Sequence, residues 1–369
     1  MVTYDSAQQM TRFDFFLWER AERGEDFGTL PEAVARTAGS PAEPVAVETV
    51  LVSGDNPLVL LRPRGVLTLL TVGPVSLLHV GDSHGDFVLG AWPTDHEGVF
   101  HLVGSVPPTD PRWQRVERWI VKAAPDVVPV FLNHDDFTDI GTALSEFGEV
   151  EVSRLTARRP SDFSSLTRGW AARASSLRPS HHEAIRETEA EGASVRTLRL
   201  HIADVISLHL RRRAGATYYN GNFGLFDRVV LGRLATAAAR RRELLSGRER
   251  QVDEEPLRPI TIRLPQPTLV DAEATGEVIQ VLESQRDVAV AVLHRNPYLH
   301  VVVSDASDGS NFDVFVTEPD VIEVHPGFRA SMGALTRLTQ SLGDQFSALA
   351  IDEAAPPEPV SLDDLVSPF

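Results

Sequence analysis

Short runs rich in Val and Leu, separated by Gly, Pro, Asp or Asn, fill the chain between Val45 and Gly104 and restrict its fold more than any other feature. The runs are Val45–Val52, Leu58–Leu61, Val66–Val72, Val75–Val80, Phe87–Leu89 and Val99–Val103. Short apolar runs between turn-forming residues are typical of strands joined by tight connections. We therefore expect an antiparallel β meander of about five or six strands.

Helices are expected to flank this meander. An apolar group near the N-terminus has helical spacing and consists of Met10, Phe13, Phe16 and Leu17. Thr29 and Glu32 have the spacing of a capping box, which predicts the start of a second helix. Beyond the meander, the apolar pattern predicts a strand–helix–strand unit over residues 127–155. Residues 1–159 are thus expected to form an α+β domain.

The central segment, residues 160–250, is expected to be helical and rich in arginine. Apolar residues at helical spacing predict one helix over Val195–Leu208. The pattern breaks at a loop rich in Gly and Asn and then predicts a second helix over Leu225–Leu245.

The remaining segments differ in composition. Residues 251–267 contain four prolines and are expected to form a linker. Residues 268–351 combine apolar runs, an Asp308–Gly309 turn signal and a helical pattern, which predicts a small α+β domain. Residues 352–369 are acidic and are expected to form a flexible tail. The predicted fold class is mixed α/β or α+β, with several domains.

Composition excludes several kinds of protein. The chain has no cysteine and a formal net charge of −17, and Lys122 is its one lysine. Without cysteine there are no disulfides, thiolate metal sites or cysteine nucleophiles. No signal-peptide pattern and no apolar run of about 18 residues is present, so we expect a cytoplasmic protein without a membrane partner. No Walker A, Rossmann or H-E-x-x-H pattern occurs, and no cofactor is expected.

The segment Gly81–Gly85 reads Gly-Asp-Ser-His-Gly, which matches the G-x-S-x-G pattern and follows an apolar run. It resembles the nucleophile elbow of α/β-hydrolases, in which the glycines allow a tight turn that exposes the serine. The resemblance implies a serine esterase whose triad candidates are Ser83, Asp135 or Asp136, and His181 or His201. The tip of a hairpin is the alternative that we favour, because these residues favour turns and no helical pattern follows the serine.

The same segment also resembles the first motif of metallophosphoesterases, which hold two metal ions that activate water. The residues Asn133-His134-Asp135 resemble the asparagine–histidine motif of that family. The resemblance implies a metal-dependent phosphoesterase with metal ligands Asp82, His84 and His134. The aspartate-bearing motif that the family has between the two is missing, because Gly104 is followed by Ser105.

Histidines of the meander offer another metal hypothesis. They form two pairs spaced by five residues, namely His79 with His84 and His96 with His101. If their strands pair, several imidazoles could converge on a metal ion. Spacing along strands does not fix which side chains meet, so isolated histidines in turns are the alternative.

Residues 205–250 carry the clearest charge pattern, with ten arginines against three acidic residues and a local net charge of +7. Guanidinium groups bind phosphates and aromatic rings stack on bases, so this segment predicts nucleic acid or another polyanion as ligand. The candidate binding residues are Arg211, Arg212, Arg213, Tyr218, Tyr219, Phe223, Arg228, Arg240, Arg241 and Arg242. Alternatively, the arginines form ion pairs with acidic segments elsewhere and the tyrosines lie in the core.

The C-terminal tip, from Leu362 to Phe369, combines acidic residues with a terminal Pro-Phe pair. It resembles the acidic tip of bacterial single-stranded DNA-binding proteins, which recruits partner proteins. The resemblance implies a protein partner that is bound through Asp363, Asp364 and Phe369. An ordinary frayed terminus is the alternative.

Together these patterns predict a non-enzymatic binding protein, with a polyanion on the arginine-rich segment and a partner protein on the tail. Nucleic acid is the first candidate for the polyanion. A hydrolase centred on Gly81–Gly85 and a structural or assembly component are the alternative functions. The sequence leaves the oligomeric state open.

Overall fold

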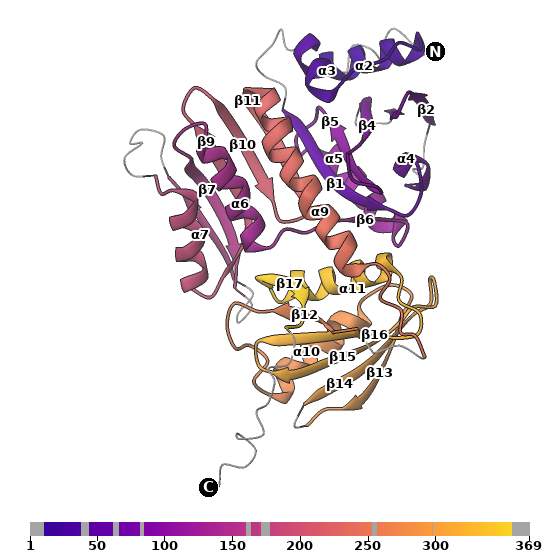
Figure 1. Cartoon of the computed structure of the whole chain (residues 1–369), viewed down its shortest axis with the longest axis vertical. Helices are drawn as coiled ribbons and strands as arrows, with labels where there is room; N and C mark the ends of the chain where they lie inside the picture. The colour runs from indigo at the N-terminus through magenta and orange to yellow at the C-terminus, as the bar shows by residue number, and fades with distance from the viewer. Residues whose placement is uncertain are drawn as a thin grey trace.

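The computed structural model describes residues 11–37, 44–61, 66–81, 85–159, 164–170, 178–252, 257–296 and 298–355. These residues form two antiparallel sheets with helices packed against them, which is a mixed α+β fold (Figure 1). The predicted mixed α+β class is therefore confirmed. Among the described residues, no helix has both the length and the apolar character that crossing a membrane requires.

The large sheet has eleven strands in the order β2-β3-β4-β5-β1-β11-β10-β9-β7-β8, with β6 paired to β1. Its strands are β1 (Val45–Val52), β2 (Val66–Val72), β3 (Val75–Gly81), β4 (Phe87–Pro93), β5 (Val99–Gly104), β6 (Val127–Pro129), β7 (Glu151–Arg158), β8 (Ser165–Gly169), β9 (Ser194–Ile202), β10 (Ile206–Arg211) and β11 (Gly215–Gly221). The predicted meander forms one end of this sheet, because β2, β3, β4 and β5 pair in chain order.

The small sheet has the order β13-β14-β15-β16-β12-β17. Its strands are β12 (Ile260–Arg263), β13 (Val288–His294), β14 (Leu299–Asp305), β15 (Asn311–Glu318), β16 (Val321–Pro326) and β17 (Ala350–Glu353). Gly309 has a φ of +80° in the turn between β14 and β15, so the turn predicted at Asp308–Gly309 is confirmed.

Helices surround both sheets. Those before β9 are α2 (Arg12–Glu22), α3 (Leu30–Thr37), α4 (Pro57–Leu60), α5 (Pro111–Ala123), α6 (His134–Ser145) and α7 (His181–Ala190). After β11 come α8 (Phe223–Leu225), the π-helix η2 (Phe226–Leu231) and α9 (Gly232–Leu245), and the small sheet carries α10 (Ala272–Glu283) and α11 (Met332–Gln345). The capping box predicted at the start of α3 is present, since the backbone N–H of Thr29 donates to the Glu32 carboxylate.

The helix predicted over Val195–Leu208 was wrong, because this segment forms β9 and β10. Leu198 and Ile202 fit a helical spacing of four, yet they also fit the period of two that governs a strand. Leu200 continues the buried alternation, and Asp204, with a φ of +56°, turns the chain into β10. The helix predicted over Leu225–Leu245 is confirmed by η2 and α9.

Leu58–Leu61 was also wrongly predicted, as a strand. Pro57 starts a short helix here, and the Asn56 side chain accepts a hydrogen bond from the backbone N–H of Leu58. A proline in the first turn with an asparagine cap favours a helix over a strand.

Segment boundaries differ from the expected ones. The large sheet continues across the predicted boundary at 159/160, since β7 on one side pairs with β8 and β9 on the other. The predicted linker 251–267 contains β12, whose Ile260 and Ile262 are fully buried. The predicted tail from 352 begins inside β17, where Glu353 forms ion pairs with Arg248 and Arg258.

Candidate functional site

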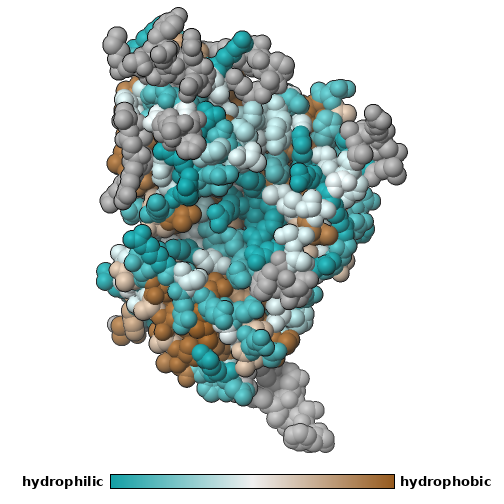
Figure 2. Space-filling view, turned by 180° about the vertical axis from the view of Figure 1, so that it is seen from behind, coloured by the Kyte–Doolittle hydropathy of each residue, from teal (hydrophilic) through white to brown (hydrophobic). Residues whose placement is uncertain are grey.

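Strands β7, β9, β10 and β11 bury one face beneath α6 and α7, and on the other face Arg154 in β7 and Arg199 in β9 are exposed. The inward residues, such as Leu155, Leu198 and Leu208, belong to the core beneath α6 and α7. Figure 1 shows these helices in front of the sheet. Seen from behind, the middle of the molecule is hollowed and hydrophilic (Figure 2). We refer to the side of these four strands that faces away from α6 and α7 as the open face.

A row of cationic and imidazole side chains crosses the open face. Arg154 in β7 lies opposite Arg199 in β9, and Arg199 lies opposite His209 in β10. The row ends at Thr217 in β11, which lies opposite His209. Side chains directly opposite in antiparallel strands have Cβ atoms about 5 Å apart, and like charges there repel each other. The row is therefore a place where positive charge is concentrated.

The two arginines of this row lack carboxylate partners within the described part of the chain. Arg154 is exposed, and no hydrogen bond or ion pair is found for its guanidinium group. The Arg199 guanidinium lies 4.7 Å from the ring centroid of Tyr219. An arginine above a half-buried tyrosine ring forms a cation–π pair. The base of a nucleotide can stack on such a pair while the phosphate of the nucleotide contacts the guanidinium group.

The pKa of His209 reports the local charge. It is lowered to about 4, first by burial and then by Arg211, Arg199 and Arg154. The imidazole is therefore neutral at neutral pH, and three arginines are close enough to oppose its protonation. Among these, Arg211 is neutralised by Glu48, whose Oε2 accepts a hydrogen bond from Nη2 at 2.9 Å.

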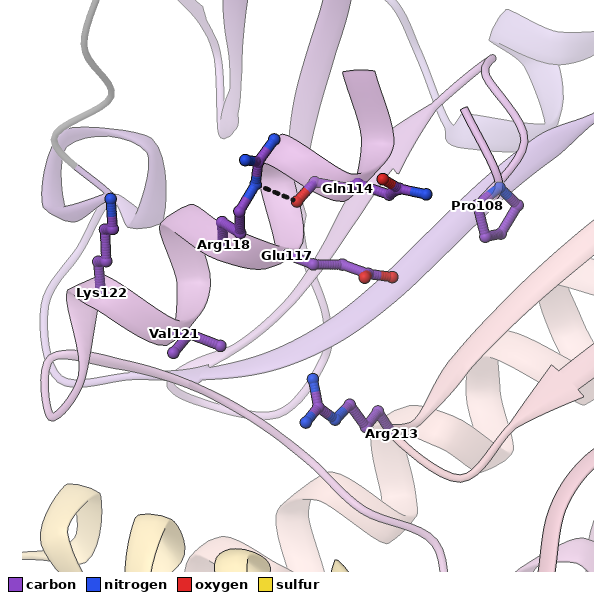
Figure 3. Close-up of a pocket in the computed structure, with 7 residues that line it drawn as sticks. All are labelled: Pro108, Gln114, Glu117, Arg118, Val121, Lys122 and Arg213. Atoms are coloured by element: carbon purple, nitrogen blue, oxygen red, sulfur yellow. Dashed lines mark hydrogen bonds between the residues drawn. The ribbon is translucent and has the colours of Figure 1, made fainter. Parts of the chain in front are cut away.

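A cavity of about 590 Å³ borders the open face, between α5 and the turn that follows β10. Arg213 extends from this turn toward Val121 and Glu117 of α5 (Figure 3). Arg118 and Lys122 line the same cavity from α5, so three of its seven lining residues are cationic. This arrangement extends the positive charge of the open face to its rim.

A second cavity, of about 320 Å³, shares Val121 and Arg213 with the first and reaches α10 and α11. Its lining includes Arg158 from β7 and Arg337 from α11, opposed by Asp344. The rim of the open face is thus built jointly by the parts of the molecule that carry the large and the small sheet.

Most of the predicted polyanion-binding residues do not lie on this face. The ion pairs are Arg211 with Glu48, Arg212 and Arg213 with Asp344, Arg240 and Arg241 with Asp136, and Arg242 with Glu97. Arg212 and Arg241 are buried, and the Arg228 guanidinium lies 5.8 Å from the ring of Phe147. Tyr218 and Phe223 pack against Phe226, with ring centroids 5.6 and 5.4 Å from it. Arg211, Arg213 and Tyr219 are the predicted residues that border the open face.

Arg154, Arg199 and His209 were missed as a group. Arg154 preceded the arginine-rich window, and a helix was expected where β9 and β10 lie. The available signal was the alternation of Thr197, Arg199 and His201 with buried leucines, which marks the polar side of a strand.

No protein-family model matches the chain, and no curated protein sequence is significantly similar to it. The site must therefore be interpreted from its own geometry. The candidate partner-binding residues Asp363, Asp364 and Phe369 lie outside the described residues.

The predicted hydrolase triad is not assembled by the residues that the structure describes. Ser83 lies outside them, Asp135 is exposed, and Asp136 is engaged by arginines. His181 is buried, burial lowers its pKa to about 4, and neither ring nitrogen has a hydrogen-bond partner there. His201 lies on β9, opposite Ser207. No hydrogen bond therefore joins a predicted acid to a predicted base.

The metal hypothesis loses one of its three ligands. Asp82 and His84 lie outside the described residues, but His134 is buried with both ring nitrogens engaged. The backbone N–H of Val195 donates to Nε2 at 2.8 Å, so Nδ1 carries the proton and donates to Glu189 at 2.7 Å. No lone pair is left for a metal ion. Within the described ranges, which contain His79, His96 and His101 but not His84, no three potential metal-ligating side chains gather.

Proposed function

We propose that the protein is a non-enzymatic binding protein whose open face engages a polyanion, with single-stranded nucleic acid as the first candidate. The observation that carries this proposal is the row formed by Arg154, Arg199 and His209. Two exposed guanidinium groups without carboxylate partners in the described structure stand there, on the side of the sheet that faces away from α6 and α7.

Single-stranded nucleic acid fits this face better than a duplex does. A sheet surface with exposed rings lets unpaired bases stack while arginines contact the phosphates. Tyr219 and His201 supply rings beside Arg199, and Thr156 and Thr197 supply hydroxyl groups. The net charge of −17 would repel a polyanion from most other surfaces and so favour this one.

The acidic tip remains part of the proposal as a second contact. Asp363, Asp364 and Phe369 are proposed to recruit a partner protein. This part rests on the sequence pattern alone.

The test is fluorescence anisotropy of a labelled single-stranded RNA of about 20 nucleotides at low salt, where phosphate contacts are strongest. The Arg154→Ala/Arg199→Ala variant is expected to bind at least about ten-fold more weakly than the native protein. The matched control is Arg186→Ala/Arg286→Ala, which removes the same charge from exposed sites on α7 and beyond α10.

Loss of affinity in the first variant, with native affinity in the control, is the expected result. Failure of the native protein to bind, or equal losses in both variants, would contradict the proposal. Single-stranded DNA of the same length serves as the second ligand, because the 2′-hydroxyl group distinguishes the two nucleic acids.

A further inference from the structure

A cavity of about 850 Å³ lies on the opposite side of the large sheet from the open face. The N-terminus of α3, the end of β4, β5 and the helices η2 and α9 enclose it. Trp92 and His101 line it from neighbouring strands, where their Cα atoms lie directly opposite each other. Leu231 and Leu30 add apolar surface from the helices. The volume is in the range of pockets that hold small organic ligands.

Two residues that line this cavity have polar side-chain atoms without protein partners in the described structure. The indole Nε1 of Trp92 is buried and has no hydrogen-bond partner in the described structure. His101 uses Nδ1 for a 3.1 Å hydrogen bond with the Thr49 hydroxyl, and none of the described residues bonds to its Nε2. Burial lowers the pKa of His101 to about 4, so this ring is neutral at pH 7.

Asp227 faces the same cavity from the π-helix η2. Burial raises the pKa of its carboxyl group, and no cation or hydrogen-bond donor among the described residues is paired with it. A π-helix is rare and often occurs at functional sites. A half-buried carboxylate without a partner costs free energy that a ligand donor would recover.

Arg233 lines the cavity from the next helical turn and is exposed, with no ion pair in the described structure. The cavity therefore has an aromatic wall, a carboxylate acceptor and a free cation. These features suit a planar head that carries N–H groups, placed against Trp92 and Asp227. They also suit an anionic tail, placed on Arg233.

We propose that this cavity binds a small organic anion with a planar, N–H-bearing head, which is the chemistry of a nucleoside monophosphate. The planar head stacks on Trp92, its N–H group donates to Asp227, and the phosphate contacts Arg233. The site is separate from the open face, and neither proposal depends on the other.

The experiment is isothermal titration calorimetry of the full chain with AMP, GMP, CMP and UMP, together with the free nucleosides and inorganic phosphate. At least one nucleotide is expected to bind, and more tightly than its nucleoside or phosphate alone. Asp227→Asn and Arg233→Ala are each expected to weaken binding about ten-fold, which is the effect of about 1.4 kcal/mol. Arg186→Ala, which changes an exposed helical arginine on α7, is expected to bind as the native protein does.

Circular dichroism of each variant confirms that it is folded before its affinity is compared. The proposal is overturned if none of the four nucleotides binds at millimolar concentration. It is also overturned if binding is unchanged in both cavity variants, or if phosphate alone binds as tightly as the nucleotides.

Discussion

The pKa of His209 depends on the positive charge that surrounds this residue on the open face. Its pKa of about 4 has burial as the first cause and the neighbouring arginines as the second. A histidine whose pKa is lowered on folding stabilises the protein above pH 6.5, and this stabilisation is lost as pH falls toward 4. Two of the arginines that oppose protonation, Arg154 and Arg199, are the groups proposed to hold phosphates.

A bound polyanion should raise the pKa of His209. Phosphates among the arginines would cancel part of their repulsion, so an upward shift of about one unit is expected. Nuclear magnetic resonance titration of the imidazole, with and without saturating oligonucleotide, measures it. An unchanged pKa while anisotropy reports binding would mean that the ligand lies elsewhere.

Asp14 in α2 is a second residue whose titration is expected to affect the stability of the fold. Its carboxyl group is fully buried and accepts hydrogen bonds from the Ser105 hydroxyl at 2.7 Å and from the Val88 backbone at 3.2 Å. Burial outweighs these bonds and raises the pKa to about 7. The carboxyl thus stabilises the fold fully below pH 3.8, and this stabilisation is lost as pH rises through 7.

Asp14→Asn should flatten this pH dependence. The melting temperature of the native protein is expected to fall more between pH 5 and pH 8 than that of the variant, because asparagine cannot ionise. Differential scanning fluorimetry across this range measures the difference. Parallel curves for the two proteins would show that Asp14 titrates normally.

Among the strands of the large sheet, Gly215 in β11 leaves room for an ion pair between residues of the two neighbouring strands. Glu48 in β1 and Arg211 in β10 flank β11, and Gly215 of β11 lies between them in register. A Cβ atom built on Gly215 would clash with the Arg211 guanidinium and the Glu48 carboxylate. A side chain at this position would therefore displace the Arg211–Glu48 ion pair at the edge of the open face.

Gly215→Ala should destabilise the protein by about 1–3 kcal/mol, the range for inserting a methyl group where there is no room. Chemical denaturation measures the free energy of unfolding. Gly169→Ala is the control, because it places a methyl group in β8 with no atom within 4 Å. Equal stability of the two variants would contradict the close packing of Gly215 against Arg211 and Glu48.

The strands of the meander could be predicted from sequence, and the pairing of the open face could not. Runs closed by Gly, Pro or Asn predict hairpins because their signal is local. Leu198 and Ile202 fit both helix and strand periods, so only the contacts with β7 and β10 decide their state. The ion pair of Arg240 with Asp136 joins residues that are 104 positions apart, so no local sequence pattern predicts it either.

At the scale of the whole molecule, Asp344 of α11 joins the parts that carry the two sheets. It accepts a 2.7 Å hydrogen bond from Arg196 in β9, and it lies 3.6 Å from nitrogens of Arg212 and Arg213. Arg212 also donates to the backbone carbonyl of Ala348, close to β17. These contacts link α11 and the residues before β17 to β9 and to the turn between β10 and β11.

Asp344→Asn should weaken the junction strongly, because it leaves the buried Arg212 without its carboxylate. A loss of about 3–5 kcal/mol is expected for breaking a buried pair. Calorimetry measures the loss and also shows whether one unfolding transition becomes two. Asp320→Asn is the control, because no ion pair of its side chain is found in the described structure. A single transition at the native temperature would contradict this role for Asp344.

The position of a bound oligonucleotide decides whether the open face is the binding surface. Photo-crosslinking with a 4-thiouridine RNA, followed by mass spectrometry of the linked peptides, reports that position. If the open face binds the RNA, crosslinks are expected in the peptides that contain Arg154, Arg199, His209 or Tyr219. Crosslinks confined to other peptides, in a protein that binds the RNA, would contradict it.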